Sequence, residues 1–257
     1  MPSAWLNPAG GLRYHVRALL AGRDWQPFRA SLASWLATFE APAARAVLVG
    51  PSAGYTLSDA FLSRFSAITV LEPDPIAGLL LSRRLRRLGV ATLRLERADR
   101  LIEPLLDGGH AGDGLAELLR ADPSACLIFA NVLGQARFLV QDPDFERFKT
   151  AFRAQIGPLL AGRAWLSFHD RLSGSLAPNF EQPHTTPARL DDRAVLRELY
   201  PSAPGTAQVE LFDHQSAGFF PRHLAHTYFR WQIERGQHHL IEGVMSVPNS
   251  WQSKAFR

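Results

Sequence analysis

The sequence is poor in cysteine and in long apolar runs, and each scarcity excludes a class of protein. Cys126 is the only cysteine among the 257 residues, so no intramolecular disulfide can form, and its place in the apolar segment 125–130 predicts a buried strand thiol. No apolar run approaches the roughly 18 residues that span a membrane. The first residues lack the basic and apolar regions of a signal peptide. We therefore expect a cytoplasmic protein with no membrane partner.

Lysine is also scarce, since the 28 basic residues include only two lysines, Lys149 and Lys254, and the net charge is +4. The densest basic run, residues 83–87, lies in a segment with leucines at 79, 80, 85 and 88 that could face a core. This spacing predicts arginines on the solvated face of a helix. A nucleic-acid partner is thus not favoured, and the sequence leaves the oligomeric state and the substrate open.

Short apolar runs alternate regularly with helical segments from residue 46 onward. The runs cover residues 46–49, 68–71, 91–95, 125–130 and 164–168. Their spacing predicts five parallel strands joined by right-handed helical crossovers. A further strand at 208–212 and a hairpin within 228–247 would extend the sheet, so the sequence predicts an α/β fold.

Two amphipathic segments precede the first strand. The expected core-facing residues are Leu12, Val16, Leu19 and Leu20 in the first segment, and Phe28, Leu32, Trp35, Leu36 and Phe39 in the second. We expect residues 1–43 to form a helical appendage or lid, and residues 44–257 to form the α/β domain.

The most informative stretch is residues 46–74, which resemble a strand, a glycine turn, a helix and a second strand. Gly50, Ser52 and Gly54 form a turn of small residues that a ligand can approach closely. A helix over 55–65 would direct its first amide groups at that turn. Glu72 follows about 20 residues later, where an acid can accept hydrogen bonds from both ribose hydroxyls.

The turn lacks the Gly-x-Gly-x-x-Gly fingerprint of dinucleotide sites, because Ser52 and Tyr55 replace two glycines. It resembles motif I of the class I S-adenosylmethionine-dependent methyltransferases. The resemblance implies a Rossmann-like sheet of seven mostly parallel strands that ends in an antiparallel strand. It also implies S-adenosylmethionine as cofactor, held by the glycine turn and Glu72, with Asp99 contacting the adenine amino group. Asp99 also suits a helix N-cap. Where the family usually carries an acid, this chain has Leu48.

Catalytic candidates lie after the fourth and fifth runs, because open α/β sheets bind ligands at the carboxyl ends of their strands. Asn131 offers an uncharged acceptor and donor there, or it serves a turn. His169 can act as a general base near neutral pH, or it is a satisfied histidine at a strand end. Asp170 need not pair with it, since neighbours on a strand point to opposite sides.

The sequence predicts no metal site. His223 and His226 would share one face of a helix, but no third ligand follows at a recognisable spacing. Of the pair His238 and His239, one side chain should point inward and the other outward. The pattern leaves two functions open: a methyltransferase of unknown substrate, or a non-catalytic binding or interaction module of the same fold.

Overall fold

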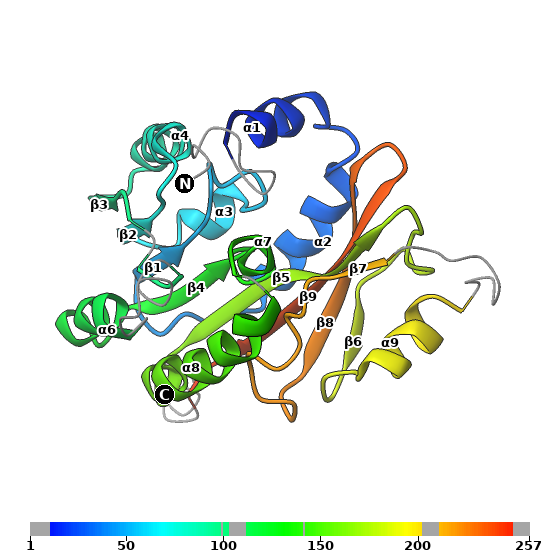
Figure 1. The fold of residues 1–257 in the computed structure, drawn as a ribbon. Helices are drawn as coiled ribbons and strands as arrows, with labels where there is room; N and C mark the ends of the chain where they lie inside the picture. Colours follow the sequence, from blue (N-terminus) through cyan, green and yellow to red (C-terminus); the bar gives the residue numbers. More distant parts are fainter. Residues whose placement is uncertain (1–10, 99, 103–111, 141, 202–210, 249–257) are drawn as a thin grey trace, which may run out of the picture.

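The computed structural model describes residues 11–98, 100–102, 112–140, 142–201 and 211–248. The described residues form one mixed sheet with the strand order β3-β2-β1-β4-β5-β9-β8-β6, and β7 pairs with β5 (Figure 1). The strands are β1 (Arg45–Val49), β2 (Ala67–Leu71), β3 (Thr92–Glu96), β4 (Cys126–Ala130), β5 (Trp165–Gly174), β6 (His184–Thr186), β7 (Leu211–Asp213), β8 (His226–Glu234) and β9 (Gln237–Ser246).

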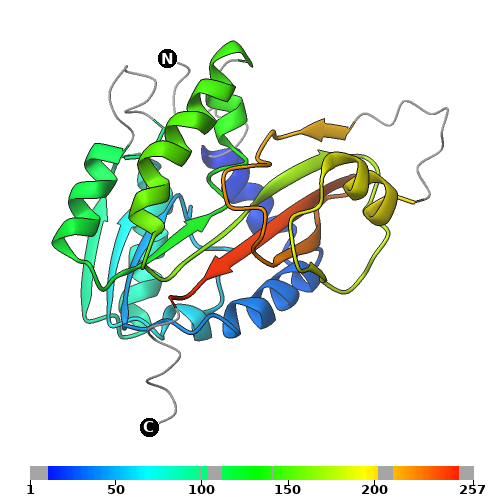
Figure 2. The same cartoon turned by 90° about the horizontal axis from the view of Figure 1, so that it is seen from below.

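Helices cover both faces of this sheet. The helices are α1 (Gly11–Leu20), α2 (Gln26–Ala37), α3 (Asp59–Leu62), α4 (Pro75–Arg87), α6 (Gly112–Ala121), α7 (Ala136–Leu139), α8 (Asp142–Leu160) and α9 (Asp192–Leu199). Figure 2 shows α6 and α8 on one face and α2, α3 and α4 on the other. Each face has its own apolar core, and a smaller third cluster lies between α9 and the strands β5, β8 and β9.

The five predicted parallel strands are confirmed, because β1 to β5 all pair in parallel with their neighbours among these five. The hairpin is confirmed too, with Gly236 in the left-handed region (φ +74°) between β8 and β9. The predicted count of seven strands is wrong, since the described residues alone form a sheet of nine. The short strands β6 and β7 have three residues each, too few for a period of two to mark them. Residues 208–210 of the predicted strand lie outside the described residues.

The expected core-facing side of the first helix is wrong. Its leucines and valine are exposed, by 53% for Leu12 and 74% for Leu19, whereas His15 is buried. The buried side of this helix carries His15, which lies between the Tyr55 hydroxyl and the Asp74 carboxylate, and Ala18, which lies in the core. The second helix packs as expected, and its Phe28, Leu32 and Leu36 enter the same core as β1 and β2.

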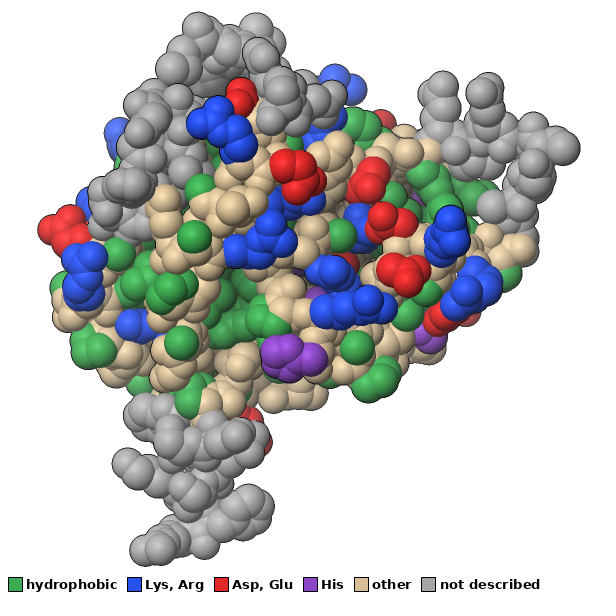
Figure 3. All heavy atoms as spheres, turned by 60° about the horizontal axis from the view of Figure 1, so that its bottom comes forward, with side chains coloured by type: hydrophobic (Ala, Val, Ile, Leu, Met, Phe, Trp, Pro, Cys, Tyr) green, Lys and Arg blue, Asp and Glu red, His purple; other side chains and the backbone are tan. Residues whose placement is uncertain are grey.

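The arginine-rich segment is helical, as predicted, but its buried side is rotated relative to the expectation. Leu81 and Leu85 of α4 are buried, whereas Leu79 and Leu80 are exposed. On the face seen in Figure 3, acidic and basic side chains lie side by side. Cys126 is fully buried in β4, as predicted. None of the described helices is both long and apolar enough to span a bilayer.

Candidate functional site

The order of the strands places a crevice at the carboxyl ends of the parallel strands. From β1 the chain continues to β2 and β3 on one side, and it returns to β4 and β5 on the other. Loops that leave such a reversal point diverge, and ligands of open α/β sheets bind between them. Here the loop after β1 meets the loop after β4, because a Cβ added to Gly50 would lie 2.6 Å from the Cβ of Val132.

The loop after β1 is a left-handed turn and not the start of a helix. Gly50, Ser52 and Gly54 have φ values of +62°, +52° and +71°. The predicted helix over 55–65 is shortened to α3, which begins only after Ser58, whose hydroxyl accepts from the Phe61 amide. The helix amides therefore do not point at the turn.

Glu72 secures this turn from the end of β2. Its Oε2 accepts a hydrogen bond from the Ser52 amide at 2.7 Å, and its Oε1 accepts one from the Asp74 amide at 3.0 Å. Asp74 in turn lies 3.1 Å from His15 of α1. The structure thus brings together the sequence-predicted Gly50, Ser52, Gly54 and Glu72. The contact between His15 and Asp74 holds α1 beside them.

A cavity of about 270 Å³ opens at the carboxyl ends of β4 and β5, and the loop after β4, whose Val132 lies against Gly50, forms part of its wall. Its wall combines α1, the loop after β4, β5 and the β8–β9 hairpin, and it includes Asn131, Asp170, His214, Trp231 and His239. The indole Nε1 of Trp231 is buried and finds no acceptor among the described residues. The cavity therefore presents polar groups on an aromatic wall.

Asn131 lies in the cavity wall with a left-handed backbone (φ +62°), and its Oδ1 accepts from the Asp170 amide at 3.0 Å. Asparagine tolerates this conformation better than most residues. We expect Asn131→Ala to lower the free energy of unfolding by about 1–2 kcal/mol more than Asn131→Gly, which loses the same bond but adopts the backbone freely. Urea denaturation of both variants measures this difference. Equal losses would mean that the backbone of Asn131 carries no strain.

Asp170 and His239 form the closest polar pair of the cavity, with 2.6 Å between Asp170 Oδ1 and His239 Nδ1. Burial opposes ionisation of Asp170, but the charge and the hydrogen bond of His239 lower the pKa of the carboxyl to about 2. A β-bulge after Asp170 shifts the register against β9. Asp170 and Ser173, three residues apart, consequently both line the cavity.

His214 joins this pair from the segment after β7. Its Nδ1 donates to the Gly134 carbonyl at 2.9 Å, which leaves the lone pair of Nε2 facing the Ser173 hydroxyl, also at 2.9 Å. Burial lowers the pKa of His214, so the ring is neutral at pH 7. Gly134 must be a glycine, since an added Cβ would lie 2.6–2.8 Å from three atoms of Asp170.

His169 does not line this cavity. Its ring packs near Phe220, and its Nδ1 lies 2.9 Å from the Ser167 hydroxyl. Burial lowers the pKa of His169 to about 4. Of the two sequence-predicted catalytic residues, the structure thus places Asn131 in the cavity wall and His169 outside it, and the expectation that His169 need not pair with Asp170 fits this arrangement.

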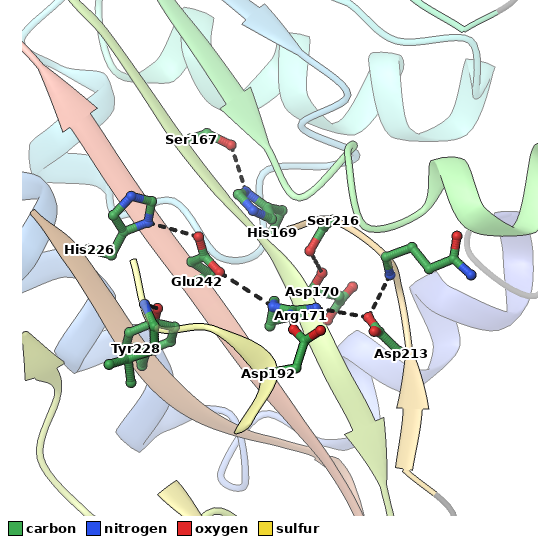
Figure 4. Close-up of polar contacts among 12 residues, drawn as sticks. Ser167, His169, Asp170, Arg171, Asp192, Asp213, Ser216, His226, Tyr228 and Glu242 are labelled. Carbon is green, nitrogen blue, oxygen red and sulfur yellow. Dashed lines mark hydrogen bonds and ion pairs between the residues drawn. The ribbon is translucent and has the colours of Figure 1, made fainter. Parts of the chain in front are cut away.

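An ionic network lies next to the cavity, around the buried side chains of Arg171 and Glu242 (Figure 4). The guanidinium contacts Asp213 at 2.9 Å, Asp192, and Glu242 at 3.7 Å. Glu242 also accepts a hydrogen bond from His226 Nδ1 at 2.8 Å. His226 begins β8, so it does not share a helical face with His223. The network fixes β5 to β9 and to the segment that carries His214.

Comparison with known proteins gives a limited result. No family model matches the sequence, and no curated protein matches it. Among solved structures, the chain is similar to an O-methyltransferase from Bacillus cereus in complex with SAH, with a TM-score of 0.35, 13% identity, and coverage of 95% of this chain and 84% of that one. It is also similar to the protein PH0851, with a TM-score of 0.36, 10% identity and coverage of 84% of this chain. The match spans 46% of the length of PH0851.

Sequence reasoning missed Asp170, His214 and His239 as a group. Strand periodicity indicated that one of His238 and His239 points inward, but the bulge that aligns His239 with Ser173 leaves no mark in the sequence. Asp99, the predicted adenine contact, lies outside the described residues. Leu48 is fully buried in the core, so this position packs against apolar neighbours.

Proposed function

We propose that this chain binds S-adenosylmethionine at the glycine turn and transfers its methyl group to an acceptor in the neighbouring cavity. The observation that carries the proposal is the position of Glu72 at the end of β2, fixed against Ser52, at the same sheet edge as the cavity. A carboxylate oxygen can accept more than one hydrogen bond. Glu72 thus holds the turn at the strand end where an acidic side chain can accept hydrogen bonds from ribose hydroxyls.

When bound, the cofactor supplies an electrophilic methyl group, so the protein mainly has to position the acceptor and take up its proton. The loop from Asn131 to Gln135 separates the turn from the cavity, and it would set the acceptor in line. Asp170, His214 and His239 are the cavity groups that can activate an acceptor hydroxyl or amine. The acceptor itself is of unknown identity.

Calorimetric titration with S-adenosylmethionine and S-adenosylhomocysteine tests the proposal. We expect both ligands to bind, and Glu72→Gln to weaken binding about tenfold or more, because the new amide group faces a backbone N–H and the charged hydrogen bonds are lost. Glu117→Gln on the exposed side of α6 is the matched control and should bind as the parent does. Absence of heat with both ligands would refute the cofactor site and favour a non-catalytic module.

A further inference from the structure

Three potential metal ligands meet in the cavity from three separate parts of the chain. Asp170 lies on β5, His214 follows β7, and His239 lies on β9. One ligand atom of each lies within 4.8 Å of the other two. Asp170 and His214 are buried, and the side chain of His239 is 13% exposed, on the cavity side.

The histidine orientation suits coordination. The Gly134 carbonyl accepts from Nδ1 of His214 and thereby presents the Nε2 lone pair toward Ser173. Metal-binding histidines usually donate their second ring nitrogen to a carbonyl or carboxylate in this way, which fixes the ring and the tautomer. His214 therefore already has the ring orientation and the tautomer in which Nε2 carries the lone pair.

The carboxylate is equally constrained. The Asp170 amide donates to Asn131 Oδ1, and the Asp170 carbonyl accepts from the Ser216 hydroxyl at 2.8 Å (Figure 4). Gly134 packs directly against the same residue. These contacts hold the main chain of Asp170, and its carboxylate lies 2.6 Å from Nδ1 of His239.

We propose that Asp170, His214 and His239 bind one divalent transition-metal ion, such as Zn²⁺ or Fe²⁺. Two imidazoles and one carboxylate suit first-row transition metals better than Mg²⁺ or Ca²⁺, which prefer sets of oxygen ligands. Three protein ligands leave at least one coordination position open, and here it faces the cavity. Binding replaces two hydrogen bonds by bonds to the metal: the one between Asp170 and His239, and the one that Nε2 of His214 accepts from the Ser173 hydroxyl. Any proton displaced from the ligands passes to the solvent.

The open position suits an oxygen ligand with negative charge. The cavity wall has two positive and two negative side chains. Arg17 pairs with Glu234 at 3.0 Å, and the other two are Arg13 and Asp170, so these four charges cancel. A divalent ion would make the wall net positive. The ion would thus bind and polarise an acceptor oxygen next to the proposed cofactor site.

Titration of the chelator-treated full chain with Zn²⁺, followed by calorimetry, tests the inference. We expect one ion to bind per chain. Asp170→Asn, His214→Ala and His239→Ala should each weaken binding by about tenfold or more. His238→Ala is the matched control, since His238 is the neighbour of His239 on β9 and does not line the cavity. It should bind Zn²⁺ as the parent does.

Equal affinity in the parent and in His239→Ala would overturn the inference, and so would equal weakening by His238→Ala. Because His214 carries two buried hydrogen bonds, the circular dichroism of each variant is recorded, and His239→Ala decides the result if His214→Ala fails to fold. Parallel titration with S-adenosylhomocysteine in the absence of metal distinguishes failure of this site from failure of the proposed cofactor site.

Discussion

Gly134→Ala is expected to lower the free energy of unfolding by about 3 kcal/mol. The added Cβ would lie 2.6 Å from Cβ, 2.7 Å from the amide nitrogen and 2.8 Å from the carbonyl oxygen of Asp170. Two of these atoms belong to the backbone of the buried strand β5, so no rotamer change relieves the contact. The loop must move, which breaks the hydrogen bond from His214 to Gly134.

Guanidinium denaturation measures the loss, with Gly22→Ala as the control. Gly22 lies in the turn between α1 and α2, where the nearest atom to an added Cβ is 3.9 Å away. That variant should change stability by less than about 0.5 kcal/mol. A similar small effect at Gly134 would contradict the close approach of the loop to β5.

Arg171→Met is expected to cost about 3–5 kcal/mol, the usual loss when one member of a buried ion pair is removed. Arg171 is 1% exposed, and its loss leaves the carboxylate of Glu242, 2% exposed, without its guanidinium partner. Arg197→Met is the control, because Arg197 pairs with Glu198 at the surface and should contribute about 0–1 kcal/mol. Denaturant titration at pH 7 compares the two variants. Equal losses would mean that the network around Arg171 is as weak as a surface pair.

The same network predicts a dependence on pH. Burial alone would raise the pKa of Glu242, but the hydrogen bond from His226 and the nearby positive charges lower it below the ordinary 4.5. A lowered carboxyl pKa stabilises the folded state above the ordinary value and loses this contribution as the pH falls through the folded value. The stability difference between the parent and Glu242→Gln should therefore be largest near neutral pH and shrink below about pH 4.5. A difference that stays constant down to pH 3 would exclude Glu242 as the titrating group.

The central sheet could be predicted because its signals are local. Each of β1, β2 and β4 is a short apolar run, and the helices between them have apolar residues at helical spacing. The orientation of α1 could not be predicted, because its buried side carries His15, with its contacts to Tyr55 and Asp74, and not its leucines. These partners lie 40 and 59 residues away in the sequence.

The site was predictable only in part, for a related reason. The rule that ligands bind at strand ends leads to Asn131 and to the end of β5. It does not decide between His169 and Asp170, because that choice depends on which face of β5 meets the cavity. The bulge after Asp170 changes this alternation within the strand. Which side chains line the cavity therefore depends on the register between two paired strands. Composition and periodicity do not encode that register.

The insertion of β9 between β5 and β8 has a consequence for biosynthesis. His239 and Asp170 are 69 residues apart, and His214 and Gly134 are 80 apart, so the cavity closes only after β9 has left the ribosome. Until then β5, a ten-residue strand buried along its whole length in the finished protein, is an open sheet edge. A nascent chain stopped before residue 237 would carry all five parallel strands but lack His239 of the cavity wall. This edge is where we expect chaperones to bind or aggregation to begin.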